Sequence, residues 1–294
     1  MNKVGFIGVG IMGKSMVRNL MKAGFELHIY ARTKSKVEDV ISEGAQFHES
    51  IKDCVQDCDA VITIVGFPQD VEEVYFDQGN ILGSAKKGAY LIDMTTTSPQ
   101  IAEKIYEEGT KRGFHVMDAP VTGGDTGAKA GTLSILVGGE KEDYEACMPL
   151  FEAMGTNINY QGKAGCGQHC KLANQIMIAG TLSGVCEALT YAKEQGLDPE
   201  VFMKSVATGA AGSKQLDTFG PKILKDDYAP GFFMKHFIKD MKLALIEANR
   251  KGLSLDVLSM VLANYEELEQ EGYGDLGTQA LMKFYDEEHR NMEE

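Results

Sequence analysis

Residues 3–13 read KVGFIGVGIMG, and this stretch decides the fold of the first half of the chain. A short apolar run, Val4–Ile7, is typical of a buried strand. It leads directly into Gly8, Gly10 and Gly13, and a helical pattern with apolar residues at helix spacing follows to Ala23. This order of strand, glycines and helix indicates a nucleotide-binding turn.

Each glycine of this turn has a separate role in such a site. Gly8 permits the tight turn, Gly10 lets a pyrophosphate approach the backbone, and Gly13 allows the helix to pack closely on the strand. The first N–H groups of the helix, at Ile11 and Met12, supply donors at the positive end of the helix dipole. We therefore predict a dinucleotide site; the alternative is a glycine-rich turn that binds nothing.

Beyond this turn, short β-rich runs alternate with helical patterns up to about residue 160. Such alternation predicts right-handed crossovers and a largely parallel sheet, the doubly wound Rossmann architecture. From Gly165 onward the strand signals stop. We predict a Rossmann-type α/β domain at 1–162 and an all-helical domain at 163–294 for substrate binding and oligomerisation, joined by a long helix at about 167–195.

The predicted long helix carries a stripe of small residues at Gly180, Gly184 and Ala188, which would let another helix approach closely. Packing within the chain and a subunit interface are about equally consistent with this stripe. We expect a homo-oligomer, either a dimer or a tetramer.

Composition narrows the class of protein. The chain has 294 residues, a net charge of −14 and 44% hydrophobic residues. A broad negative field disfavours nucleic acid and anionic membranes as partners. Glycines interrupt the only early apolar run, and Leu172–Cys186 is too short to span a bilayer. The six cysteines and six histidines lack metal-ligand spacing, so we predict a cytoplasmic protein with reduced thiols and no metal.

The second predicted strand ends in Tyr30-Ala31-Arg32-Thr33-Lys34. An NAD site usually places a carboxylate here, on the ribose 2′-hydroxyl, whereas this segment offers none. Arg32 and Thr33 are suited to a 2′-phosphate, so NADP is favoured over NAD. The alternative is that these residues are ordinary solvated charges at a helix start.

The segment Asp118-Ala119-Pro120-Val121-Thr122-Gly123-Gly124 follows another predicted strand, at the edge where ligands of doubly wound folds bind. The hydroxyl of Thr122 and the backbone N–H groups of Gly123 and Gly124 offer the donors that a small carboxylate needs. A glycine-rich turn without a ligand is the competing interpretation.

The long helix opens with Gly165-Cys166-Gly167-Gln168-His169-Cys170-Lys171-Leu172-Ala173-Asn174-Gln175. Lys171 and Asn174 lie three residues apart and therefore share a helix face. Most helical lysines are solvated, but the apolar residues after Ala173 make this one unusual, and such surroundings lower a lysine pKa toward values suited to proton transfer.

Taken together, these motifs resemble the β-hydroxyacid dehydrogenase family, which includes 3-hydroxyisobutyrate dehydrogenase, tartronate semialdehyde reductase and the glyoxylate/succinic semialdehyde reductases. The resemblance covers essentially the whole chain. It rests on GFIGVGIMG, DMTTTSP, DAPVTGG, GTLSILVGG, GCGQHCKLANQ and PGFFMKHFIKD. The KLANQ run, Ala211–Ser213 and GYGDLGTQAL look most like the tartronate semialdehyde reductase branch.

The resemblance implies a reaction between a short β-hydroxy acid and its semialdehyde, in a cleft between the two domains. Lys171 would be the general acid, and Asn174 with Thr122, Gly123 and Gly124 would hold the substrate carboxylate. Thr96 and Lys239 would lie near the nicotinamide.

Two departures from the family pattern matter. Thr122 stands where serine is common, which keeps the hydroxyl but adds a methyl group to the pocket. Ala31 and Arg32 stand where some members carry an acidic residue, which puts NAD in doubt.

Two other functions share part of this pattern. A 6-phosphogluconate dehydrogenase needs a larger helical domain than 294 residues leave. A non-catalytic NADP-binding sensor would keep the glycine turn but have no use for a lysine beside an amide in the cleft.

Overall fold

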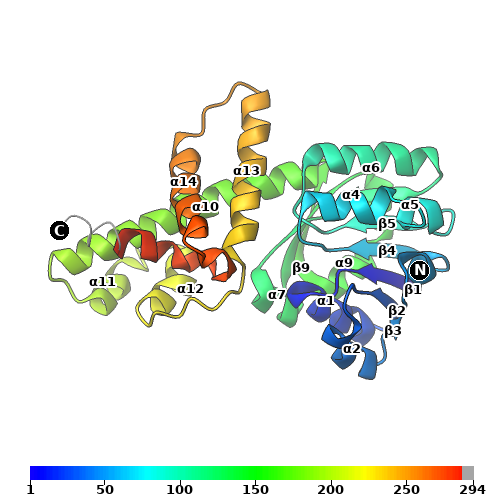
Figure 1. The fold of residues 1–294 in the computed structure, drawn as a ribbon, viewed down its shortest axis with the longest axis horizontal. Helices are drawn as coiled ribbons and strands as arrows, with labels where there is room; N and C mark the ends of the chain where they lie inside the picture. The colour runs from blue at the N-terminus through cyan, green and yellow to red at the C-terminus, as the bar shows by residue number, and fades with distance from the viewer. Residues whose placement is uncertain (287–294) are drawn as a thin grey trace. The chain divides into compact units, whose positions relative to one another are not determined.

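The computed structural model describes residues 1–286. The chain forms two compact units, Met1–Lys171 and a second that begins at Leu172. Both are drawn in Figure 1.

The first unit contains all nine strands of the described residues, in one sheet. They are β1 (Lys3–Ile7), β2 (Glu26–Tyr30), β3 (Gln46–Phe47), β4 (Ala60–Thr63), β5 (Tyr90–Asp93), β6 (His115–Asp118), β7 (Val121–Thr122), β8 (Leu133–Gly138) and β9 (Gly155–Gly162).

Helices connect these strands. They are α1 (Ile11–Lys22), α2 (Glu38–Ser42), α3 (Ile51–Val55), α4 (Pro68–Phe76), α5 (Ile81–Ser84), α6 (Pro99–Lys111), α7 (Gly124–Ala130), α8 (Lys141–Ala146) and α9 (Met148–Met154), with a 3₁₀ turn at Lys34–Lys36.

The sheet order is β3-β2-β1-β4-β5-β6-β8-β7, with β9 beside β8. The first six strands are parallel and follow the 3-2-1-4-5-6 order of a Rossmann fold. Their last residues are in register across the sheet: Ile7 pairs with Tyr30 and Thr63, and Asp93 pairs with Thr63 and Asp118. The segments that follow these residues therefore all begin at the carboxyl-terminal ends of the strands, along the same edge of the sheet.

The prediction of a largely parallel sheet is confirmed, and its exceptions lie at β7 and β8. β8 runs antiparallel to both β6 and β7. The start of β8 pairs with the end of β7, since Thr122 faces Ser134, and only the seven-residue α7 lies in the connection. Between β7 and β8 the chain thus reverses direction at the carboxyl-terminal ends of the parallel strands, instead of crossing over to begin another parallel strand. The short β3, the hairpin strand β7 and β9 were not predicted.

Two apolar cores sandwich the sheet. Residues alternate along β1, with Val4 and Phe6 in the core beneath α1, α7 and α9, and Ile7 in the core beneath α3, α4, α5 and α6. Figure 1 shows α4, α5 and α6 on one side of the strands and α1 and α2 on the other. A sheet buried on both faces explains why its strands read as continuous apolar runs.

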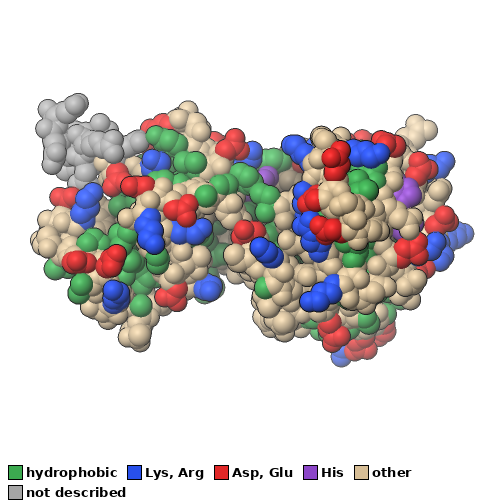
Figure 2. All heavy atoms as spheres, turned by 90° about the horizontal axis from the view of Figure 1, so that it is seen from below, with side chains coloured by type: hydrophobic (Ala, Val, Ile, Leu, Met, Phe, Trp, Pro, Cys, Tyr) green, Lys and Arg blue, Asp and Glu red, His purple; other side chains and the backbone are tan. Residues whose placement is uncertain are grey.

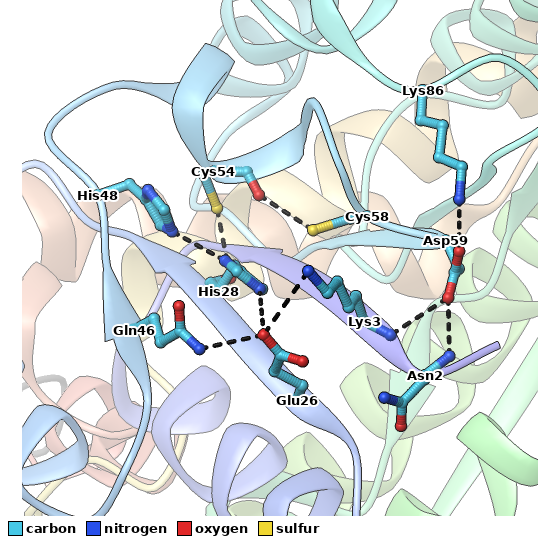
Figure 3. A network of polar contacts seen from close by, with 10 residues as sticks. All are labelled: Asn2, Lys3, Glu26, His28, Gln46, His48, Cys54, Cys58, Asp59 and Lys86. Carbon is cyan, nitrogen blue, oxygen red and sulfur yellow. Dashed lines mark hydrogen bonds and ion pairs between the residues drawn. The ribbon is translucent and has the colours of Figure 1, made fainter.

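The amino-terminal ends of the strands carry a polar network, drawn in Figure 3. Asp59 accepts hydrogen bonds from the N–H groups of Asn2 and Lys3 at 2.8 and 3.3 Å, and from Lys86 Nζ at 2.8 Å. Glu26 contacts His28 Nε2 at 3.1 Å, while His28 Nδ1 faces a nitrogen of His48 at 2.9 Å. This network connects neighbouring strands at their amino-terminal ends, at the opposite end of the strands from the glycine turn.

Cysteine and histidine side chains in this region make ordinary contacts. Cys54 Sγ donates to the His28 carbonyl and Cys58 Sγ to the Cys54 carbonyl, at 3.3 and 3.1 Å. All six cysteines are free thiols. Within residues 1–286, no three His, Cys, Asp or Glu side chains are placed to hold a metal ion.

The second unit is helical. Its helices are α10 (Cys166–Glu194), whose first residues belong to the first unit, α11 (Pro199–Val206), α12 (Lys214–Ile223), α13 (Met234–Arg250) and α14 (Asp256–Gln270), with 3₁₀ turns at Tyr273–Asp275 and Thr278–Leu281.

Helix α10 ends where the sequence predicts, at Gly196 with φ +73°. The N–H of Gly196 bonds to the Lys193 carbonyl and that of Leu197 to the Ala192 carbonyl, the paired bonds of a Schellman cap. Within the small-residue stripe, a Cβ at Gly180 would lie 3.6 Å from Val257 of α14, whereas Gly184 faces open space.

At 29 residues, α10 is long and apolar enough to cross a membrane, which corrects the prediction made from Leu172–Cys186 alone. However, 44% of its most apolar window is buried within the protein. Its polar residues also bond to protein partners: Gln175 to Asp240, and Ser183 to Tyr285. These contacts are those of a helix in a protein core.

Figure 2 shows acidic and basic side chains interspersed over the visible face, without a broad basic area on that face. Several large apolar side chains of the helical unit are solvent-exposed, including Met177 at 73% and Tyr191 at 67%, both on α10.

Candidate active site

The glycine turn has the geometry that a dinucleotide site needs. Gly8 has φ +98°, and a Cβ there would overlap the carbonyl oxygen of Ile64. A Cβ at Gly13 would overlap the carbonyl oxygen of Gly8. Gly10 is different, because a Cβ there would meet nothing within 4 Å. Two glycines are thus required by the protein itself, and the third leaves open space in front of α1.

The amino terminus of α1 faces this space. Gly10 is its N-cap and provides no side-chain acceptor, and the first turn holds no acidic residue. The first N–H groups of a helix have no acceptor within the helix. The N–H groups of Ile11, Met12 and Gly13, together with the helix dipole, suit a pyrophosphate. The residues present therefore fit a dinucleotide.

Arg32 and Thr33 follow β2 at the same sheet edge. Arg32 Nη2 contacts Asp70 Oδ1 at 2.6 Å and Glu73 Oε2 at 3.1 Å, both on α4. The hydrogen bond to Asp70 raises the pKa of the guanidinium, whose side chain is 63% exposed. Arg32 is therefore accessible to a 2′-phosphate, but two carboxylates already compete for it.

Thr96 lies in the loop after β5, and a glutamine of α10 holds this loop on both sides. The Gln168 side chain accepts from Thr97 N at 3.0 Å and donates to the Thr95 carbonyl at 2.8 Å. Gln168 is fully buried. The loop that carries Thr96 is thus attached to the helix that carries Lys171.

Asp118, the last residue of β6, anchors the start of the same helix. Its carboxylate accepts from Gly165 N and Gln168 N, each at 2.8 Å. Asp118 is 3% exposed, and burial raises its pKa. A Cβ at Gly167 would overlap the Leu136 carbonyl, so the helix start lies against the backbone of β8. These contacts fix where the first turns of α10 begin.

The strand next to β6 ends in a second buried carboxylate, Asp93. Its Oδ1 accepts from the Thr63 hydroxyl at 2.7 Å and from Thr95 N at 3.1 Å. Burial raises the pKa of Asp93 to about 6. Asp93 thereby orders the start of the Thr96 loop.

Lys171 lies one turn beyond these anchors and is 7% exposed. Thr122, Gly123 and Gly124 occupy the turn between β7 and α7, four residues after Asp118. Gly123 and Gly124 have φ +132° and +64°, and a Cβ at Gly124 would meet nothing within 4 Å. Binding of a carboxylate at this turn stays a prediction.

Asn174 and Lys239 belong to a polar chain of the helical unit. Asn174 Nδ2 donates to Gln175 Oε1 at 2.8 Å, and Gln175 Nε2 donates to Asp240 Oδ2 at 2.7 Å. Lys239 Nζ lies 3.0 Å from Asp240 Oδ1. Asp240 is fully buried between these partners. The structure thus connects Asn174 of α10 with Lys239 of α13.

Sequence reasoning missed Asp93, Asp118 and Gln168 as members of this arrangement. Asp93 and Asp118 are the terminal residues of adjacent parallel strands, and that position was a usable signal. Gln168 gave none, since a single glutamine in a helix is compatible with many environments.

A Rossmann sheet with this glycine turn at its carboxyl-terminal edge is typical of dinucleotide-dependent oxidoreductases. Residues 3–162 match the family model described as the NAD binding domain of 6-phosphogluconate dehydrogenase, and residues 165–285 match that described as NAD-binding of NADP-dependent 3-hydroxyisobutyrate dehydrogenase.

The chain is 49% identical to an uncharacterized oxidoreductase of Bacillus subtilis, over 96% of this chain and 98% of the relative. It is 37% identical to 2-hydroxy-3-oxopropionate reductase of Escherichia coli, over 86% of each. The structure resembles that of 3-hydroxyisobutyrate dehydrogenase of Mycobacterium tuberculosis with L-serine, with a TM-score of 0.88, 26% identity and coverage of 96% and 98%. The chain belongs to the β-hydroxyacid dehydrogenase family and is an NAD(P)-dependent oxidoreductase.

Proposed function

We propose that the protein reduces a short semialdehyde acid to the corresponding β-hydroxy acid, with tartronate semialdehyde (2-hydroxy-3-oxopropionate) as the favoured substrate and NADPH as the favoured reductant. The observation that carries the proposal is the burial of Lys171, one helical turn beyond the residues that bond to the Thr96 loop and to Asp118. The named relative in Escherichia coli supports the substrate class.

In this proposal the nicotinamide supplies the hydride, and the protein handles the charge that develops on the substrate. The aldehyde carbon gains the hydride while its carbonyl oxygen becomes negative. The Lys171 ammonium stabilises that oxygen and donates its proton, which leaves a neutral amine that solvent reprotonates. In the oxidising direction, neutral Lys171 accepts the hydroxyl proton.

The Thr122–Gly124 turn would bind the substrate carboxylate. Gly123 and Gly124 have positive φ angles, the kind of backbone that forms anion-binding concavities from successive N–H groups, and the Thr122 hydroxyl would add a donor. Asn174 would contribute a further hydrogen bond to the substrate. Fixing the carboxylate orients the carbonyl toward the cofactor and Lys171, which is a positioning effect.

The cofactor would use residues at the sheet edge. Gly8, Gly10 and Gly13 with the N–H groups of α1 would hold the pyrophosphate, and Arg32 with Thr33 the 2′-phosphate. Thr96 and Lys239 would lie near the nicotinamide. The absence of a carboxylate between Tyr30 and Lys34 supports NADP over NAD.

A second candidate is oxidation of 3-hydroxyisobutyrate, favoured by the similarity to the structure that carries that name. The methyl group of Thr122 affects the choice between these substrates. It would narrow the proposed carboxylate site, because the family pattern commonly has the smaller serine at this position. Glyoxylate/succinic semialdehyde reduction is a third member of the same class.

We also propose that the protein is a cytoplasmic homo-oligomer. The exposed apolar side chains of α10, Met177 and Tyr191, and the open position at Gly184 support contact with a second copy.

Initial rates on tartronate semialdehyde, methylmalonate semialdehyde, succinic semialdehyde and glyoxylate, each with NADPH and NADH, test the proposal through nicotinamide absorbance. Fastest turnover of tartronate semialdehyde with NADPH is expected. A higher kcat/KM for another compound reassigns the substrate. Cofactor binding without turnover of any compound favours a sensor function instead.

A further inference from the structure

The side chain of Gln168 joins the two segments that the proposed mechanism brings together. One is the helix that carries Lys171, three residues later. The other is the loop that carries Thr96, since the bonds go to Thr95 O and Thr97 N on either side of it. These two hydrogen bonds of the Gln168 amide connect the loop to the first turn of α10.

The helix side of this connection is rigid. Asp118 accepts from the N–H of Gln168 itself and from that of Gly165. The overlap that a Cβ at Gly167 would make with the Leu136 carbonyl leaves the helix start no room to move toward the sheet. Because Lys171 follows within one helical turn, its Cα position is set by these anchors.

The loop side depends on Gln168. Asp93 orders Thr95 through its N–H, and Thr95 Oγ1 accepts from Val65 N at 3.0 Å. Thr97 N has Gln168 as its acceptor, and Thr97 is fully buried. Without that acceptor, a buried N–H is left unsatisfied, which is unfavourable, and the loop is expected to shift to relieve it.

We propose that Gln168 is a positioning residue for the reaction: its amide sets the distance between the Thr96 loop, assigned to the nicotinamide, and the Lys171 helix, assigned to the proton. This inference rests on the proposed function. A displacement of about 1 Å between reacting groups lowers a rate by up to about 100-fold, so removal of the amide should act mainly on kcat.

The test compares Gln168→Met with a matched control. Methionine keeps an unbranched side chain of similar length but makes neither hydrogen bond. The control is Gln279→Met, because Gln279 is also fully buried and its amide also makes two hydrogen bonds to the backbone. Both are donated by Nε2, to Asp227 O at 2.9 Å and Ala229 O at 3.1 Å within the helical unit. Both variants lose similar bonds, and only one loses the connection to Thr96.

For each variant kcat, KM, the cofactor Kd and Tm are measured. The expected result for Gln168→Met is a fall in kcat of about 10- to 100-fold with the cofactor Kd changed by less than about threefold, while Gln279→Met keeps kcat within about threefold. Equal losses of kcat in both variants, in step with Tm, overturn the inference, and so does a wild-type kcat in Gln168→Met.

Gln168→Glu provides a second variant, which also decides the matter if Gln168→Met does not fold. Its side chain has the same length, and when protonated it can both donate to Thr95 O and accept from Thr97 N. We expect its kcat, relative to that of the wild type, to rise as pH falls. A ratio that is flat with pH overturns the inference. Lys171→Ala distinguishes failure of the proposed function from failure of this inference. Full activity of Lys171→Ala would contradict the proposed function. An inactive Lys171→Ala together with a fully active Gln168→Met would contradict only the role of Gln168.

Discussion

The glycine turn allows a prediction in which fold stability and cofactor affinity separate cleanly. The perturbation is alanine at Gly10 or at Gly13. Both substitutions add a single methyl group to the same turn. The surroundings of that methyl group differ, because it would enter open space at Gly10 and overlap the carbonyl oxygen of Gly8 at Gly13.

At Gly10 the stability change should be small. The residue has φ −86° and ψ −156°, an extended conformation that alanine adopts. Replacing glycine reduces the entropy of the unfolded chain, which stabilises by about 0.4–1 kcal/mol. Alanine is a poorer N-cap than glycine, which opposes this by a similar amount. The net change in unfolding free energy should therefore lie within about 1 kcal/mol of zero.

Cofactor affinity, unlike stability, should change strongly in Gly10→Ala. A methyl group at position 10 occupies the space in front of α1 that the pyrophosphate would enter. Hydrogen bonds to a charged group contribute about 1.5–3 kcal/mol, so loss of one corresponds to a Kd raised by about 10- to 100-fold.

At Gly13 the fold itself should suffer. The overlapping atom belongs to the backbone, so relief requires movement of β1 relative to α1. Overpacking of this kind costs about 1–3 kcal/mol, or a fall in Tm of roughly 5 °C for a unit of this size.

Differential scanning fluorimetry and fluorescence titration with NADPH measure both quantities. Gly10→Ala should keep its Tm without cofactor and lose most of the cofactor-induced rise in Tm. Wild-type NADPH affinity in Gly10→Ala refutes the assignment of the pyrophosphate to this space. An unchanged Tm in Gly13→Ala refutes the packing argument.

Arg32→Ala should weaken NADP much more than NAD in the same titration, and equal losses would remove the 2′-phosphate assignment; Glu73→Gln, which removes a competing carboxylate, should tighten NADP by up to about fivefold and leave NAD unchanged. The raised pKa of Asp93, about 6, favours its protonated form in the folded state, so its contribution to stability is greatest below the unfolded pKa and is lost as pH rises through 6. Urea unfolding should show this contribution falling by roughly 1 kcal/mol between pH 5 and 7.5, and Asp93→Asn should lose that part of the pH dependence; the same slope in both proteins would rule Asp93 out as its source. Met177→Glu combined with Tyr191→Glu should lower the mass measured by light scattering, whereas an unchanged oligomer would place the interface elsewhere.

Local sequence patterns predicted those elements of the first unit whose structure is determined by nearby residues. The β1 run, the glycine turn and α1 follow from apolar periodicity and from glycine geometry, and the long helix α10 with its stop at Gly196 follows from helix signals. The antiparallel return of β8 was missed, because pairing direction depends on where the preceding strand ends.

The sequence predicted site roles for residues with distinctive side-chain chemistry. It did not predict the residues that position them, Asp93, Asp118 and Gln168. Nothing local in Gln168 reveals that its amide reaches residues more than 70 positions earlier in the chain. Similarly, the ion pairs of Arg32 with Asp70 and Glu73 join the segment after β2 to α4. Such contacts depend on tertiary structure, which a single sequence does not display.

The central claim is that Lys171 transfers the proton, and chemical rescue of Lys171→Ala tests it most directly. The variant is assayed with the preferred semialdehyde and cofactor, with and without added methylamine, after the cofactor Kd has been measured. We predict a near-complete loss of kcat, a cofactor Kd close to that of the wild type, and partial recovery of the rate that increases with methylamine concentration. Retention of most of the rate without the amine would contradict the account.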